Sequence, residues 1–185
     1  MKKLFALAIA ALAASLLFVG CEKLGGGSVD TSKLEGTWIA TSGQVSIQKN
    51  GKAVDAKTFL TDMCALYGVD PKDIDEETTA MINEMFTEMS GPQDISGGSL
   101  TFVGGKVFLQ SFDDDGDAYA ESGTYTLDGH NITLTFEGES MTMQITKLTS
   151  TDLTLKMSES LSRSENGSSI LPGYTMETYL NFIKE

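Results

Sequence analysis

The sequence predicts a mainly β protein, an eight-stranded antiparallel meander barrel with an inserted two-helix segment. From Ser99 to the end of the chain, apolar side chains recur at every second position, the period of a half-buried strand. Short turn sequences such as Asp128-Gly129 separate these runs, as expected between neighbouring antiparallel strands. Between residues 55 and 90 the apolar period becomes that of a helix.

The first strand is predicted over residues 33–48, with a bend at Gly43, and Asn50-Gly51 is typical of a turn. Seven strands are predicted after Ser99. Their apolar stretches run Leu100–Phe102, Val107–Phe112, Tyr119–Leu127, Ile132–Phe136, Met141–Ile145, Leu153–Met157 and Met176–Phe182. Eight consecutive strands can close into an up-and-down barrel, which removes the sheet edges. An open or two-layer sheet is the alternative.

Two helices are predicted between the first two strands. The apolar face of the first comprises Phe59, Leu60, Met63, Cys64 and Tyr67, and Gly68 suits its C-terminal end. Asp70-Pro71 suits the N-cap and first position of the second helix. The apolar face of the second comprises Met81, Ile82, Met85, Phe86 and Met89, and Ser90-Gly91-Pro92 ends it.

The charge balance narrows the classes of partner. The 185 residues include 13 Lys and Arg and 26 Asp and Glu, which gives a formal net charge of −13. A chain this acidic lacks the cations that nucleic-acid binding needs, and an anionic lipid surface repels it. Two cysteines and one histidine argue against a disulfide scaffold, a zinc finger or an iron–sulfur centre. We expect no cofactor, no metal and no nucleic-acid partner.

The first twenty residues have the pattern of an export signal. Met1-Lys2-Lys3 is basic, and the sixteen uncharged residues of Leu4–Val19 are fewer than the roughly 20 that span a bilayer. Phe18-Val19-Gly20-Cys21 resembles the lipobox of bacterial lipoproteins, although Phe18 replaces the usual Leu. The resemblance implies a signal peptide over 1–20 and lipidation of Cys21 with acyl chains such as palmitate. An ordinary signal peptide and an uncleaved anchor are the alternatives.

A lipidated Cys21 would anchor a mature chain whose charge is 11 − 26 = −15. Residues 21–32 include Gly25-Gly26-Gly27-Ser28 and would form a flexible tether, with the barrel domain over 33–185. By the sorting pattern of model lipoproteins, Glu22 favours the outer membrane, and the face stays open.

No catalytic constellation is evident, so we expect a protein that is not an enzyme. Cys64 has no His or Arg nearby in sequence to lower its pKa and is interpreted as a buried, inert thiol. Asp113, Asp115 and Asp117 have the spacing of calcium ligands, but Ala118 and Thr124 stand where such a loop needs Gly and Glu. We interpret these aspartates as a solvated hairpin tip.

Two segments resemble the bacterial lipocalin-like lipoprotein family, whose fold is a calycin barrel. Leu34-Glu35-Gly36-Thr37-Trp38 resembles the Gly-x-Trp signature, and residues 122–136 resemble a repeat-hairpin block. The resemblance implies that Trp38 packs across the closed barrel end against an Arg or Lys from the last strands. Because Arg163 falls in a polar loop and Lys184 at the C-terminus, the sequence assigns that partner to neither. Fatty-acid-binding proteins are similar but have ten strands.

Two functions remain open. In the first, the barrel binds a small hydrophobic ligand without catalysis, and the segment 55–90 is a lid. The candidate lid contacts are Phe59, Met63, Met81, Met85, Phe86 and Met89. Methionine-rich faces adapt to varied apolar ligands, although the same spacing also suits a simple core. In the second, a filled barrel serves as a structural or adaptor lipoprotein that contacts another envelope protein.

Overall fold

The computed structural model describes residues 29–112, 117–161 and 171–185. Its contacts divide the chain into two compact units. Of the described residues, those within 29–43, 94–157 and 180–185 form the barrel unit, and those within 44–93 and 158–179 form the helical unit. Strands β1, β9 and β10 contribute residues to both units.

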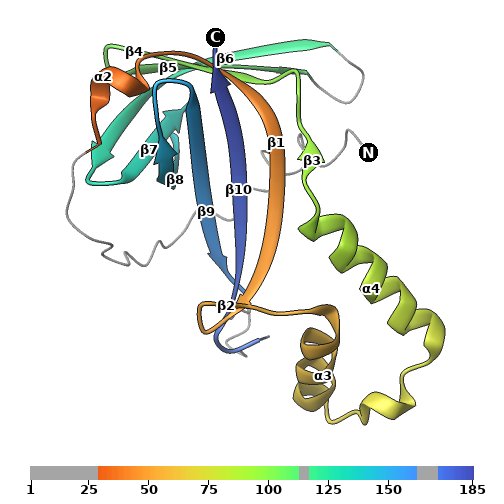
Figure 1. Ribbon diagram of the computed structural model, residues 1–185. Helices are drawn as coiled ribbons and strands as arrows, with labels where there is room; N and C mark the ends of the chain where they lie inside the picture. The colour runs from red at the N-terminus through yellow and green to blue at the C-terminus, as the bar shows by residue number, and fades with distance from the viewer. Residues whose placement is uncertain (1–28, 113–116, 162–170) are drawn as a thin grey trace. The chain divides into compact units, whose positions relative to one another are not determined.

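Eight strands follow one another around a closed antiparallel barrel (Figure 1). They are β1 (Gly36–Lys49), β4 (Ser99–Val103), β5 (Lys106–Phe112), β6 (Ala118–Asp128), β7 (Asn131–Phe136), β8 (Glu139–Leu148), β9 (Asp152–Ser160) and β10 (Tyr174–Lys184). Each pairs with the next, and β10 pairs with β1 to complete the circle. The short strands β2 (Lys52–Ala53) and β3 (Gln93–Asp94) also pair with β1. The predicted fold class is therefore confirmed, and the open and two-layer sheets are excluded.

Tight turns fix the register of the meander. Gly104 and Gly105 join β4 to β5 with φ values of 55° and 81°, a left-handed backbone that glycine adopts without steric cost. Gly123 instead allows a close approach between β6 and β7. A Cβ atom there would lie 2.7 Å from Cδ1 of Phe136, whose ring covers the glycine.

The barrel core follows the alternation of each strand. In β5, Val107, Leu109 and Ser111 are buried while Phe108 and Phe112 are exposed. The buried cluster contains Leu34, Trp38, Ala40, Leu100, Phe102, Val107, Leu109, Ile132, Leu134, Met143, Ile145, Leu153, Leu155 and Phe182. Every described strand of the barrel except β6 contributes to it, and Tyr125 and Leu127 of β6 pack against it.

The first strand begins later than predicted. Residues Thr31–Leu34 form a short helix, α2, because Asp30 accepts a hydrogen bond from the backbone N–H of Ser32 and so caps the turn. Strand β1 then starts at Gly36 and ends at Lys49. Leu34, predicted as strand, instead points its buried side chain from α2 into the barrel core.

The helical unit contains α3 (Ala56–Tyr67) and α4 (Glu76–Ser90), so the predicted two-helix segment is confirmed. Asp55 caps α3, and Gly68 ends it in the left-handed conformation, as predicted. The predicted start of the second helix was wrong. Asp70 caps only a 3-10 turn, η1 (Pro71–Asp73), because Ile74 has an extended backbone.

The N-terminus of α4 lies at a second aspartate. Asp75 accepts a hydrogen bond from the backbone N–H of Thr78 at 2.6 Å, and Glu76 and Glu77 complement the positive end of the helix. No helix among the described residues is long and apolar enough to span a membrane.

Candidate functional site

Trp38, near the start of β1, is fully buried in the barrel core. Its Nε1 donates a hydrogen bond of 2.7 Å to the carbonyl oxygen of Leu34, which fixes the indole beneath α2. The Nζ of Lys184 lies 5.1 Å from the indole centroid and donates to the carbonyl oxygen of Lys33 at 2.9 Å. This geometry is a cation–π contact, which adds to the apolar packing at this end.

Lys184 is the basic partner that the sequence did not assign. Strand β10 extends to Lys184, so the side chain emerges on the same face as the buried Phe182, two positions earlier. This alternation is the signal that would have identified it. Gly36 has a role here as well, because a Cβ atom on it would lie 2.8 Å from Cε of Lys184.

Glu35 binds the turn between β4 and β5 at the end of the barrel that contains Trp38 and Lys184. Its carboxylate accepts hydrogen bonds from the backbone N–H of Gly104 at 3.0 and 3.1 Å and from the hydroxyl of Tyr125 at 3.1 Å. Burial, and then the adjacent Glu35 carboxylate, raise the pKa of Tyr125. The Tyr125 ring packs edge-on against Phe102 in the core. Glu35 is thus a structural residue of the barrel end.

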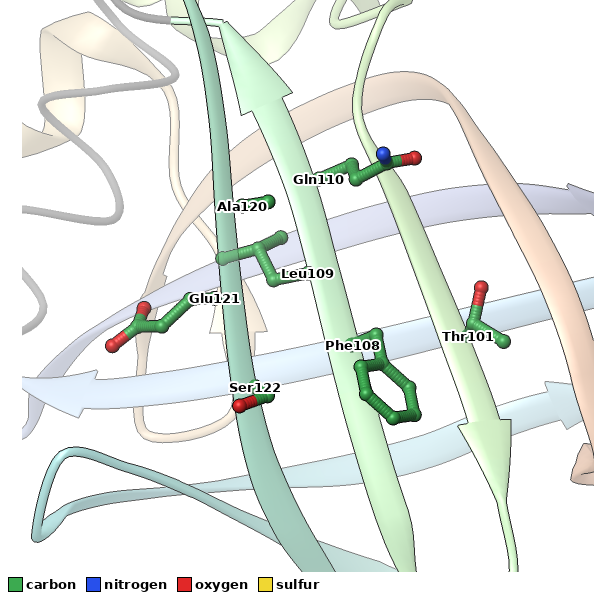
Figure 2. A pocket seen from close by; sticks show the side chains of 7 residues that line it. All are labelled: Thr101, Phe108, Leu109, Gln110, Ala120, Glu121 and Ser122. Carbon is green, nitrogen blue, oxygen red and sulfur yellow. The ribbon is translucent and has the colours of Figure 1, made fainter.

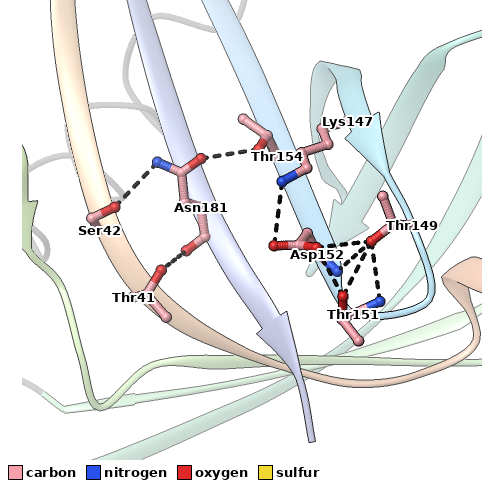
Figure 3. A network of polar contacts seen from close by, with 8 residues as sticks. All are labelled: Thr41, Ser42, Lys147, Thr149, Thr151, Asp152, Thr154 and Asn181. Carbon is pink, nitrogen blue, oxygen red and sulfur yellow. Dashed lines mark hydrogen bonds and ion pairs between the residues drawn. The ribbon is translucent and has the colours of Figure 1, made fainter.

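A second polar network joins the strands where the barrel closes (Figure 3). Asn181 of β10 accepts from Thr41 of β1 through its backbone oxygen and from Thr154 of β9 through its side chain, at 3.0 and 2.9 Å. Its amide nitrogen donates to Ser42 at 3.1 Å. Because Asn181 bonds to both neighbouring strands, this network stabilises closure.

Asp152 organises the turn between β8 and β9, as Figure 3 also shows. Its carboxylate accepts from Thr151 and Thr149 and lies 3.3 Å from the Nζ of Lys147. Hydrogen bonds from these threonines, then from Lys147, hold the pKa of Asp152 below its usual value. Both carboxylate oxygens of Asp152 interact within this turn, so the residue has a structural role, which argues against an acid–base role.

The structure brings together four of the six predicted lid residues. Phe59, Met63, Phe86 and Met89 pack in a second apolar cluster inside the helical unit. The rings of Phe59 and Phe86 lie 5.1 Å apart. The remaining members are Ile47, Val54, Ala56, Ile82, Leu161, Leu171 and Tyr174. Met81 and Met85 stand apart from this cluster, with 62% and 41% of their surface exposed. The assignment of all six residues to a ligand stays a prediction.

An ion pair accompanies this cluster. The Nζ of Lys49 lies 2.5 Å from Oδ2 of Asp62, and the hydroxyl of the buried Tyr174 donates to the same oxygen at 2.5 Å. Hydrogen bonds from Lys49 and Tyr174 lower the pKa of Asp62, while burial and Asp62 together raise the pKa of Tyr174. The three residues tie α3 to β1 and β10 within the helical unit.

Two open hollows lie on the barrel unit. One, of about 280 Å³, is lined by residues of β4, β5 and β6, namely Thr101, Phe108, Leu109, Gln110, Ala120, Glu121 and Ser122 (Figure 2). The other, of about 260 Å³, lies beside it over Phe112, Ala118 and Ala120. Most of the lining residues, such as Phe108 and Phe112, alternate away from the core face of β5, which carries Val107 and Leu109, so these hollows open on the outer face. Leu109 and Glu121, of the core-facing side, also border the first hollow.

The remaining residues that the sequence analysis singled out are a lipidation site, a row of aspartates, an arginine and a second cysteine. Cys21 and the aspartates 113–115 lie outside the described residues, as does Arg163. Cys64 is a buried free thiol of α3. In the described part of the chain, no group of three or more His, Cys, Asp or Glu side chains could hold a metal ion.

Comparison with known families identifies the fold. The model of the lipocalin-like domain family matches residues 34–155, which run from Leu34 of α2 into β9, and the chain belongs to this family. No curated protein matches the chain.

Two solved structures are similar. A lipocalin-like protein from Bacteroides uniformis is 15% identical, with 83% of this chain and 99% of that one covered, and a TM-score of 0.43. A protein from Bacteroides eggerthii is 12% identical, with 82% and 98% covered, and a TM-score of 0.41.

Proposed function

We propose that this protein is a lipid-anchored lipocalin-like protein of the cell envelope that binds a small hydrophobic ligand without catalysis. The observation that carries the proposal is the closed eight-stranded barrel, with an apolar interior and Trp38 and Lys184 across one end. Barrels of about eight strands either fill their interior with side chains or hold one small ligand. Because the side chains inside the barrel are apolar, a ligand held there would gain free energy by burying apolar surface, so the proposed ligand class is hydrophobic.

Native mass spectrometry tests the ligand. Residues 22–185 retain all described secondary structure and both apolar clusters, and they are compared before and after incubation with an envelope lipid extract. We expect a saturable added mass, one per chain, that is lost on unfolding. An unchanged mass, together with Trp38 emission unmoved by the uncharged fluorophore N-phenyl-1-naphthylamine, would reject ligand binding.

The proposed anchor is Cys21, and Glu22 after it supports sorting to the outer membrane. Cys21→Ala should move the full chain from the membrane fraction to the soluble fraction. Cys64→Ala is the matched control, because Cys64 lies inside α3 and should leave fractionation unchanged. A Cys21→Ala chain that stays with the membrane would reject the lipoprotein assignment.

A second candidate is an adaptor that acts through protein contacts, with its barrel filled. Two observations favour it. Side chains of fourteen buried residues pack in the barrel core, and the two described hollows lie on the outer face of the sheet. An apolar ligand pocket usually encloses about 300 Å³ or more, which neither hollow reaches. The mass measurement above separates the two candidates.

A further inference from the structure

Strand β6 is longer than the strand beside it. On one side, β6 pairs with β5 from Ala118 opposite Phe112 to Thr124 opposite Lys106. On the other side, its pairing with β7 begins only at Gly123, opposite Phe136. Among the described residues, Ala118–Ser122 therefore has a neighbouring strand on one side only. We call this stretch the free edge of β6.

The free edge is open to pairing. In an antiparallel pair, alternate residues direct their backbone N–H and C=O groups away from the partner strand. Such an edge can accept an added strand, and proteins often protect it with charged side chains, especially lysine, with proline or with a covering segment. Glu121 is the one charged side chain of the free edge. The free edge contains neither lysine nor proline, and Ala118, Tyr119, Ala120 and Ser122 are all exposed.

The outer face of this stretch is shaped for bulky side chains. Ala118, Ala120 and Ser122 are small, and the exposed rings of Phe112 and Phe108 stand opposite the first and last of them on β5. The hollow of about 280 Å³ lies over Ala120 and Ser122 (Figure 2), and the hollow of about 260 Å³ lies over Ala118 and Ala120. A strand added at the edge would place every second side chain beside them, within reach of the rings.

The described charges along the free edge and the neighbouring strands are mostly acidic. Among the described residues of this stretch, 107–112 and 117–146, there are five Asp and Glu and no Lys or Arg, and Lys106 lies at the far end of the β5 pairing, opposite Thr124. On the opposite face of the edge, Glu121 shares the side of Leu109, its partner in register, and accepts a hydrogen bond from the Tyr119 hydroxyl. The bond to Glu121, then burial and the charges of Glu121 and Glu137, raise the pKa of Tyr119 to about 12. This face favours cations.

A second copy of the chain fits poorly. Its own free edge would offer only Ala118, Ala120 and Ser122 to the outer face, which leaves the hollows empty. It would also bring a second Glu121 and the same acidic strands to the contact. The occupant must therefore supply both large apolar side chains and positive charge.

We propose that the free edge of β6 binds an extended segment of a basic partner protein by strand addition. Bulky apolar residues at alternate positions fill the hollows beside Phe108 and Phe112, and Lys or Arg at the intervening positions faces Glu121. This is the recognition mode in which backbone hydrogen bonds give affinity and alternate side chains give specificity. The site needs no ligand inside the barrel.

The probe is a short fluorescent peptide in which lysine alternates with valine or phenylalanine, titrated against residues 22–185 by anisotropy. A peptide of the same composition, with its lysines in one block, is the control for charge alone. We expect the alternating peptide to bind about tenfold tighter or better. Methylation of alternate backbone nitrogens should abolish this advantage. Equal binding of the block or methylated peptide would overturn strand addition.

Variants of β6 locate the site. Ala120→Leu fills the outer hollows, and Glu121→Lys reverses the charge, so each should weaken the alternating peptide by about tenfold. Thr126→Leu and Asp128→Lys are the controls, because both lie on β6 where β7 already pairs with it. Binding unaffected by Ala120→Leu would overturn the proposal. So would a dimer of the unliganded chain, seen by sedimentation, that Ala120→Leu dissociates.

Discussion

Trp38 combines complete burial with a single polar bond, and a conservative change separates the two. Trp38→Phe keeps an aromatic ring but removes the Nε1 donor, which leaves the Leu34 carbonyl oxygen without that partner. We expect the free energy of unfolding to fall by about 2 kcal/mol or more, from the unsatisfied carbonyl and the space left by the smaller ring. Urea unfolding followed by circular dichroism measures it.

The control for this change is Tyr67→Phe, at a side chain that is 65% exposed on α3. It should alter the free energy of unfolding by less than about 0.5 kcal/mol. Lys184→Met, measured alone and together with Trp38→Phe, isolates the cation–π contact as their coupling energy. Strictly additive effects would show that Lys184 contributes nothing through the indole.

The contacts of Asp62 lead us to expect that acid lowers the stability of the helical unit. Its folded-state pKa is lowered by Lys49 and Tyr174, so its stabilising contribution is complete above the ordinary pKa of aspartate, near 3.9. That contribution is lost as the pH falls through the lowered folded-state pKa. Asp62→Asn should cost about 1 kcal/mol at neutral pH, and it should flatten the loss of stability in acid.

Amide hydrogen exchange of α3 is the appropriate readout, because Trp38 belongs to the barrel unit. Asp73→Asn, at an exposed carboxylate of η1, is the matched control and should leave exchange in α3 unchanged. If Asp62→Asn and the parent chain lose protection equally as the pH falls, the ion pair does not stabilise the unit.

At the scale of elements, the packing of α4 distinguishes two kinds of predicted lid residue. Phe86 is 8% exposed and packs on Phe59, whereas Met81 lies on the outer side of the helix. Phe86→Ala should therefore destabilise the helical unit by about 3–5 kcal/mol and speed amide exchange throughout α4. Met81→Ala should change stability by less than about 0.5 kcal/mol.

The same pair of variants tests the lid interpretation. If Met81 contacts a hydrophobic ligand, Met81→Ala weakens uptake of N-phenyl-1-naphthylamine while the helical unit stays folded. Unchanged uptake by Met81→Ala would remove this residue from the candidate site. Phe86→Ala cannot make that distinction, because it disturbs the cluster that holds α3 and α4 together.

Local patterns predicted the elements well where one physical signal dominated. Alternation gave seven strands after Ser99, and Gly68 marked the end of α3 because glycine adopts the left-handed backbone there. The start of the second helix was predicted wrongly at Asp70-Pro71, because Asp75 is a competing N-cap five residues later. The extended backbone of Ile74 separates the two caps. Local sequence cannot rank two caps of equal chemistry.

Two features that depend on pairing between strands were not predicted, although the sequence carries a signal for each. The free edge of β6 exists because β7 ends at Phe136 while β6 begins at Ala118. The predicted apolar stretches Tyr119–Leu127 and Ile132–Phe136 already differ in length in this way. The Lys184–Trp38 contact likewise requires the end of β10 to meet the start of β1. The first was missed entirely, and the second could have been inferred from alternation in β10.

At the scale of the whole molecule, net charge should oppose folding at low ionic strength. Residues 22–185 carry 11 Lys and Arg against 26 Asp and Glu, a net charge of −15, so mutual repulsion is greater in the compact state than in the unfolded chain. Added NaCl screens exposed charges beyond about 10 Å at 0.1 M. We expect the Tm to rise by about 2–4 °C between low salt and moderate salt.

Charge variants distinguish repulsion from a general salt effect. Glu139→Lys combined with Glu159→Lys changes two exposed positions and reduces the net charge from −15 to −11, since each substitution adds two positive charges. The rise in Tm with NaCl should be smaller in this variant than in the parent. A Tm that falls with NaCl in both chains would mean that attractive ion pairs such as Lys49–Asp62 outweigh the repulsion. The same acidic field would speed encounter with a basic partner at the free edge of β6, so that association rate should fall as salt rises.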